Sequence, residues 1–155
     1  MGFGTLSLKG RALRLLAQRE HSRAELATKL ARHVQEGDDL NAVLDDLQAK
    51  DFINAHRVAE SLVHRRAARL GTQRLVQELR SKGLDDALVR ATAEQLRATE
   101  LERASAVWRQ RFGSVVADDA KERARQMRFL AARGFAGDVV RRVVRGGGSG
   151  EDDGL

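Results

Sequence analysis

Apolar residues recur at intervals of three and four along almost the whole chain, which is the spacing of one face of an α-helix. Near the amino terminus, Ala12, Leu13, Leu16 and Ala17 line one such face. Similar stripes are formed by Leu26 and Leu30; Leu40, Val43, Leu44 and Leu47; Ala55, Val58, Ala59 and Leu62; Leu101, Ala104, Trp108 and Phe112; and Val139, Val140, Val143 and Val144. The pattern predicts a succession of short amphipathic helices.

Polar residues and glycines between the stripes predict where helices begin and end. Ser22 is followed three residues later by Glu25, the spacing of a capping box at a helix start. Asp39 precedes another stripe and is a second predicted cap. Gly71 and Gly83 are each predicted to end a helix, since glycine commonly follows the last helical residue.

Three segments of the chain resemble one another at a period close to fifty residues. Pairs 51 residues apart are Leu79 and Leu130, Lys82 and Arg133, and Gly83 and Gly134. Pairs 49 residues apart are Ser22 and Gly71, Leu26 and Leu75, and Leu30 and Leu79. Self-similarity at a fixed period indicates a repeat architecture, in which each unit is one supersecondary element.

We therefore predict an all-α fold of three tandem three-helix repeats, at residues 7–53, 54–96 and 97–145. A flexible lead at residues 1–6 and a disordered Gly-rich, acidic tail at 146–155 are expected to flank them. Stacked repeats that contact mainly their neighbours form an elongated array, straight or curved. A compact globule of nine helices is the alternative.

Composition agrees with the helical pattern and restricts the chemistry. The chain has no proline and no cysteine, so disulfides and thiolate chemistry are excluded. Its histidines, His21, His33, His56 and His64, are scattered without the spacing of metal ligands. We expect no enzyme activity, no metal and no cofactor. No apolar run could span a bilayer, and Met1–Lys9 lacks the zones of a signal peptide, so a cytoplasmic protein is expected.

The net charge of +6 is concentrated in the middle and last repeats. Residues 1–53 are neutral, 54–82 carry +5, 83–102 carry −3 and 103–145 carry +7. An excess of Arg and Lys favours an anionic partner, either nucleic acid or an acidic protein surface, although a solvated helix face would look the same. The candidate partner-facing residues are Arg57, Arg65, Arg69, Arg74, Arg80, Lys82, Arg125, Arg128 and Arg133.

Four segments carry a resemblance to a known family, the RecX family of recombination regulators. They are residues 12–26, the junction 52–59, the central segment 71–84 and the final segment 128–135, with its Arg-Gly-Phe turn. Residues expected to maintain the fold are Leu26, Leu30, Phe52, Ile53, Gly71, Leu75, Leu79, Gly83, Leu130, Gly134 and Phe135. Phe52 and Ile53 are expected to anchor the junction in the core. The chain departs from the family at Asn54, Ala55 and His56, where acidic residues are usual.

The resemblance implies a cytoplasmic bacterial protein of tandem three-helix repeats that binds the RecA recombinase. Its main target would be the RecA filament on single-stranded DNA, and its usual effect inhibition of strand exchange and of ATP hydrolysis during recombination and the SOS response. It implies no cofactor, and we expect a monomer with at most weak direct DNA binding. Two alternatives stay open: a helical protein that acts directly on DNA, and a passive helical scaffold.

Overall fold

The computed structural model describes residues 6–146, and every regular element in that range is helical. The helices are α1 (Leu8–Gln18), α2 (Arg23–Leu30), the 3₁₀ turn η1 (Ala31–His33), α3 (Leu40–Ala49), α4 (Ala55–Arg66), α5 (Thr72–Ser81), α6 (Asp86–Ala98), α7 (Glu100–Phe112), α8 (Ala120–Ala132) and α9 (Gly137–Val144). The predicted lead, apart from Leu6, and the predicted tail, apart from Gly146, lie outside the described residues.

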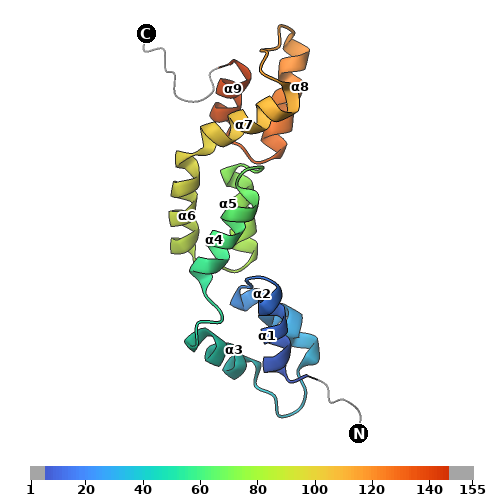
Figure 1. Cartoon of the computed structure of the whole chain (residues 1–155), viewed down its shortest axis with the longest axis vertical. Coiled ribbons are helices and arrows are strands. Elements are labelled where there is room, and N and C mark those ends of the chain that lie inside the picture. Colours follow the sequence, from blue (N-terminus) through green and yellow to red (C-terminus); the bar gives the residue numbers. More distant parts are fainter. Residues whose placement is uncertain (1–5, 147–155) are drawn as a thin grey trace.

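The helices form three bundles, each with a hydrophobic core of its own. Helices α1–α3 enclose Leu26 and Leu47, α4–α6 enclose Leu75 and Leu79, and α7–α9 enclose Leu130 and its neighbours. The bundles follow one another along the long axis of the molecule, with α1 in the bundle at one end and α9 in the bundle at the other (Figure 1). The predicted elongated array of three-helix repeats is therefore confirmed, and the compact globule was wrong.

The local signals at the first bundle set its helix boundaries. Ser22 and Glu25 form the predicted capping box of α2, and the Asp39 side chain accepts from the N–H of Ala42 at the start of α3. Gly71 was assigned wrongly, because α4 ends at Arg66. Gly71 is instead the N-cap residue of α5.

The linker between the first two bundles corrects the role predicted for Phe52. Ile53 is 4% exposed and packs in the core of the first bundle, whereas Phe52 is 47% exposed. Asp51 has a φ of +65°, and the N–H groups of both Phe52 and Ile53 donate hydrogen bonds to the carbonyl oxygen of Leu47. This turn directs only one of the two apolar side chains inward, so Phe52 does not anchor the core.

Within residues 6–146, none of the helices combines the length and the apolar character needed to cross a bilayer.

Candidate partner-binding surface

The first junction between bundles joins the start of α2 to the end of α5. The Ser22 hydroxyl donates to the carbonyl oxygen of Lys82 at 2.6 Å. The ammonium group of Lys82 lies 3.2 Å from Glu25 Oε1. A Cβ built on Gly83, which has a φ of +73°, would lie 2.8 Å from the Cβ of Ala24, so a glycine allows the close approach of the two helices.

The second junction repeats this arrangement one bundle further along, between α5 and α8. The N–H of Gly71 donates to the carbonyl oxygen of Arg133 at 2.8 Å, and the N–H of Gln73 donates to that of Gly134 at 3.2 Å. The backbones are so close that a Cβ on Gly71 would lie 2.2 Å from the carbonyl carbon of Gly134. Unpaired N–H groups at the start of one helix thus satisfy unpaired carbonyls at the end of another.

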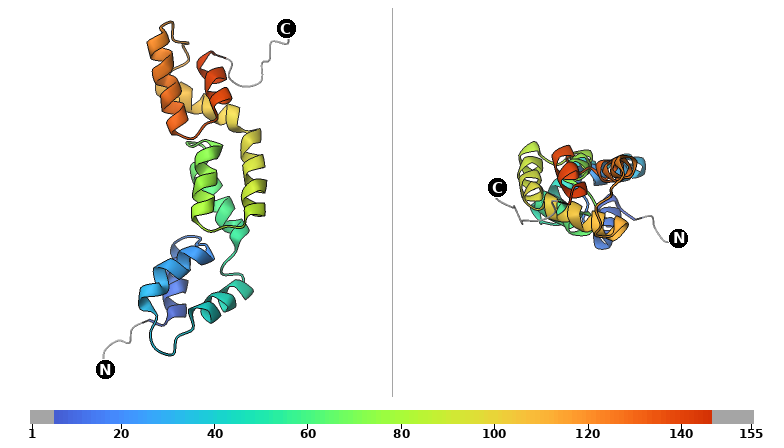
Figure 2. Two further views of the ribbon diagram at one scale, coloured as in Figure 1. Left: turned by 180° about the vertical axis from the view of Figure 1, so that it is seen from behind. Right: turned by 90° about the horizontal axis from the view of Figure 1, so that it is seen from above.

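Because of these two junctions, α8, α5 and α2 meet end to end along the molecule, as Figure 1 shows and Figure 2 shows from behind. At each junction the C-terminal end of one helix faces the N-terminal end of the next. The negative and positive ends of the helix dipoles are therefore adjacent, which favours the alignment. The basic residues of α5 and α8 are consequently carried on one extended row of helices.

Two residues that the sequence analysis did not identify, the half-buried Arg103 and the buried Glu100, fix α7 against the middle bundle. The Arg103 guanidinium donates to the carbonyl oxygens of Ala67, Leu70 and Leu96, at the ends of helices, and to the hydroxyl of Thr72. Glu100, only 4% exposed, accepts from the N–H of Thr72 at 3.0 Å. Neither residue lies in a recognisable sequence motif, so nothing local distinguished them from surface charges.

Four of the predicted basic residues are engaged in ion pairs within the chain. Arg57 contacts Glu20 and Asp51, both at 2.9 Å. The other three pairs are Arg74 with Glu78 at 4.0 Å, Lys82 with Glu25 at 3.2 Å, and Arg125 with Glu122 at 2.8 Å. Lys82 is only 16% exposed, so it belongs to the junction more than to the surface.

Another four predicted residues, Arg65, Arg69, Arg80 and Arg128, are exposed and make no ion pair with any residue between 6 and 146. Arg65 borders a hollow of about 380 Å³ between α4 and α5, beside the first junction. Arg19, Arg66 and Lys82 also line it, with Glu78 as the one carboxylate among its lining residues. Arg66 pairs with Glu78 at 2.8 Å, and Arg19 and Lys82 pair with Glu25. Arg65 is therefore the lining cation that has no ion pair with residues 6–146 and can attract an anionic partner.

In the third bundle, arginines and phenylalanines are interleaved on α7 and α8. The rings of Phe112 and Phe129 meet edge to face at 5.3 Å between centroids. Arg111, Arg125 and Arg133 place their guanidinium carbons 4.7–5.8 Å from these ring centroids. Arg111 was not among the predicted residues, although its position beside an aromatic residue was a usable signal. Arg125 already donates to Glu122, whereas Arg111 and Arg133 make no ion pair with residues 6–146. Stacking on a ring holds these two guanidinium groups in place while their edges remain able to bind an anion.

Between residues 6 and 146, no three histidine, aspartate or glutamate side chains gather closely enough to hold a metal ion.

Family models match all three bundles in order. The model described as RecX, first three-helix domain, matches residues 9–47; the second three-helix domain matches 56–92; and the third matches 98–144. The matches together span most of the chain.

Relatives from several bacteria agree with these models. The chain is 57% identical to the regulatory protein RecX of Leptothrix cholodnii over 140 residues, which is 90% of this chain and 88% of that protein. It is 51% identical to the protein of the same name from Ralstonia nicotianae, over 96% of this chain and 93% of the other. The crystal structure of RecX from Lactobacillus salivarius superposes with a TM-score of 0.73 at 20% identity, covering 90% of this chain and 94% of that one. The last likeness concerns the fold.

Proposed function

This chain belongs to the RecX family, and from that premise we propose that it binds RecA and the RecA filament on single-stranded DNA. The bound protein inhibits the recombinase and ATPase activities of the filament during recombination and DNA repair. It acts in the bacterial cytoplasm as a monomer, without a cofactor and without catalytic activity of its own.

The observation that carries the proposal is the end-to-end row of α8, α5 and α2 with exposed arginines beside it. A filament presents the same surface again at each subunit, so a long ligand made of similar bundles can contact more than one subunit. Arg65, Arg69, Arg80 and Arg128 would meet acidic patches there, and charge complementarity chiefly speeds association and fixes register.

Two mechanisms are compatible with such a contact. A protein that lies along the filament would block a second DNA molecule from entering. A protein that occupies the growing end would stop subunit addition and leave disassembly unopposed. The first acts in proportion to the filament surface covered, whereas the second acts at substoichiometric amounts.

The test is binding to preassembled RecA filaments on single-stranded DNA, with DNA-dependent ATP hydrolysis measured in parallel. The variant Arg65→Glu/Arg69→Glu is expected to bind about tenfold more weakly than the wild type, because it reverses two exposed charges of the proposed contact. The matched control is Arg90→Glu/Arg97→Glu, which makes the same charge change at exposed positions of α6 and should bind normally. Absence of wild-type binding to the filament would refute the proposal.

Direct action on DNA is the second candidate, and the interleaved Arg111, Phe112, Arg125, Phe129 and Arg133 favour it. Arginines held on aromatic rings are common where proteins bind single-stranded nucleic acid. If this candidate is correct, the protein should bind free single-stranded DNA with an affinity that falls steeply with salt. Binding to the filament that persists at salt concentrations abolishing binding to free DNA would instead favour the RecA contact.

A further inference from the structure

The first bundle has no net charge in sequence, yet its charges are separated in space. Two carboxylates of α3 are paired within the bundle: Asp46 pairs with Lys9 at 3.1 Å, and Asp45 pairs with Arg23 at 2.7 Å. Glu25 pairs with Arg19 at 2.8 Å, beside the middle bundle. The cations left over are Arg11, Arg14, Lys29 and Arg32, none of which makes an ion pair with residues 6–146.

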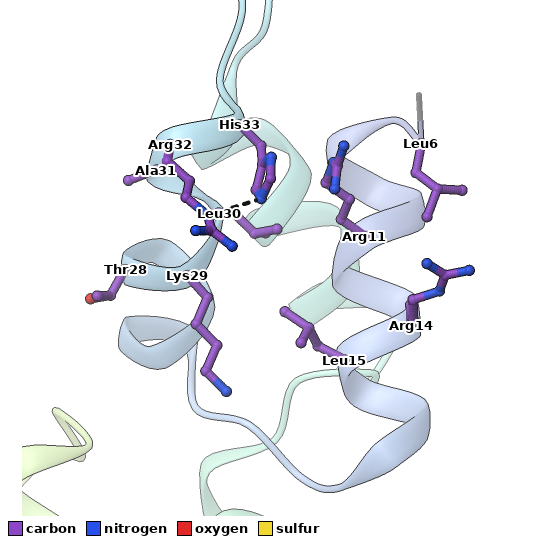
Figure 3. Close-up of a pocket in the computed structure, with 10 residues that line it drawn as sticks. All are labelled: Leu6, Arg11, Arg14, Leu15, Thr28, Lys29, Leu30, Ala31, Arg32 and His33. Carbon is purple, nitrogen blue, oxygen red and sulfur yellow. Dashed lines mark hydrogen bonds between the residues drawn. The ribbon is translucent and has the colours of Figure 1, made fainter. Parts of the chain in front are cut away.

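These four cations line one groove between α1 and the α2–η1 segment, about 630 Å³ in volume. Figure 3 shows Arg11 and Arg14 on α1, with Lys29 and Arg32 on the opposite side. No carboxylate is among the lining residues. Asp38 lines the neighbouring hollow, and its carboxylate already accepts from the N–H of Gln35 at 2.8 Å.

Between the two rows of cations the groove is aliphatic. Leu15 and Leu30 form this part, whereas Ala31 and Leu6, which is 42% exposed, lie at the outer edges of the groove (Figure 3). An aliphatic floor below a cationic rim matches a ligand that carries an apolar side chain beside negative charges. The only ring among the lining residues is the imidazole of His33, so the groove lacks the aromatic platforms on which nucleic-acid bases stack.

We propose that this groove is a docking site for an acidic peptide segment of a partner protein, one in which carboxylates flank a leucine or phenylalanine. The apolar side chain enters between Leu15 and Leu30, and the carboxylates pair with Arg11 and Arg32 at the rim. The site is separate from the arginines of the middle and last bundles. Its test therefore gives a result that does not depend on whether the proposed RecA contact is correct.

His33 provides a local reporter of occupancy. Its Nε2 accepts a hydrogen bond from Arg32 Nε at 3.2 Å. Burial, followed by the positive charges of Arg11 and Arg32, lowers the pKa of His33 below its ordinary value. Carboxylates placed beside these arginines would offset their charge, so the pKa of His33 should rise when the peptide binds.

The experiment uses a fluorescein-labelled peptide in which pairs of aspartates flank one leucine and one phenylalanine, titrated with the full chain. Arg11→Glu/Arg32→Glu should weaken binding about tenfold, equivalent to ~1.4 kcal/mol, while Arg90→Glu/Arg97→Glu, the same charge change at exposed positions of α6, should leave it unchanged. Replacing the peptide's two apolar residues by serine should also weaken binding. Circular dichroism checks that each variant is folded.

Nuclear magnetic resonance titration of the four histidines supplies the second measurement. A rise in the pKa of His33 with peptide, without a comparable change at His56 and His64, supports the site. A peptide affinity of Arg11→Glu/Arg32→Glu equal to that of the wild type would overturn the proposal. So would an oligothymidylate that binds through these residues more tightly than the peptide.

Discussion

The hydroxyl of Ser22 serves two helices from different bundles. It accepts from the N–H of Glu25 at 3.1 Å, which caps α2, and it donates to the carbonyl oxygen of Lys82 at 2.6 Å, at the end of α5. One small side chain therefore satisfies a donor and an acceptor that the helix ends would otherwise leave unpaired. The capping box, a local signal in the sequence, is at the same time part of the contact between bundles.

Ser22→Ala should lower the free energy of unfolding by about 2 kcal/mol, since it removes a cap and a second hydrogen bond. The matched control is Ser7→Ala. The Ser7 hydroxyl caps α1 by accepting from the N–H of Gly10 at 3.0 Å, and this hydroxyl makes no second hydrogen bond in the described part of the chain. Its loss should be nearer 1 kcal/mol, about the value of one cap. Urea unfolding followed by circular dichroism measures both; equal losses would count against the double role of Ser22.

Gly71→Ala should destabilise the contact between the middle and last bundles. The added Cβ would lie 2.2 Å from the backbone of Gly134 and Phe135, so the two helix ends must separate. Overpacking of this kind costs roughly 1–3 kcal/mol. In the control Gly137→Ala, the nearest atom to the new Cβ is the flexible end of Arg141 at 3.2 Å, and α9 should tolerate it. A melting temperature for Gly71→Ala equal to that of the wild type would contradict the close approach.

Arg103→Ala should be one of the more damaging substitutions of a charged residue. It leaves the carbonyl oxygens of Ala67, Leu70 and Leu96 without their donor, and we expect a loss of about 3 kcal/mol. Arg109→Ala, at an exposed position of the same helix, is the control and should change stability by less than about 0.5 kcal/mol. Thermal unfolding distinguishes the two outcomes.

Truncation of the adjacent residues Phe52 and Ile53 should lower the free energy of unfolding by very different amounts. Ile53→Ala leaves a cavity in the core of the first bundle and should lower the free energy of unfolding by about 3 kcal/mol. Phe52→Ala alters an exposed ring and should cost less than about 0.5 kcal/mol. Chemical unfolding of both variants tests the assignment, which fails if Phe52→Ala is the more destabilising change.

Stability should fall as the pH is lowered from about 5 towards 2, with Glu25 as one cause. Burial acts to raise the pKa of Glu25, but hydrogen bonds from Arg19, the N–H of Ser22 and Lys82 outweigh it and lower the pKa to about 2. A pKa that is lower in the folded than in the unfolded chain stabilises the fold above the unfolded value of 4.5. That contribution is lost as Glu25 becomes protonated.

The variant Glu25→Gln should therefore be less stable than the wild type at pH 7 and show a flatter dependence on pH between 5 and 2. Glu36→Gln is a suitable control, because Glu36 is exposed and forms no ion pair with residues 6–146. Unfolding free energies of the two variants and the wild type, measured between pH 5 and 2, test whether Glu25 contributes to the loss of stability at low pH. Parallel pH profiles for Glu25→Gln and the wild type would show that the junction carboxylate is not responsible.

The sequence alone determined the features that depend on near neighbours in the chain. Helical periodicity, the capping box at Ser22 and Glu25, and the turn at Gly83 are local. The recurrence of leucines, basic residues and a glycine at intervals of about fifty residues revealed three repeats. The glycines at 71, 83 and 134 could be recognised as important from the sequence. The close contacts that exclude a Cβ there could not, because the contacting atoms belong to another repeat.

The tertiary structure decided what depends on groups far apart in sequence. Arg103 acts on carbonyls up to 36 residues away, and only one of Phe52 and Ile53 turns inward. Net charge likewise does not reveal where charges gather on the surface. The charges of residues 1–53 sum to zero, yet Arg11, Arg14, Lys29 and Arg32 line one groove. A sum over residues ignores position, whereas the electrostatic potential at a surface depends on distance, and folding sets the distances.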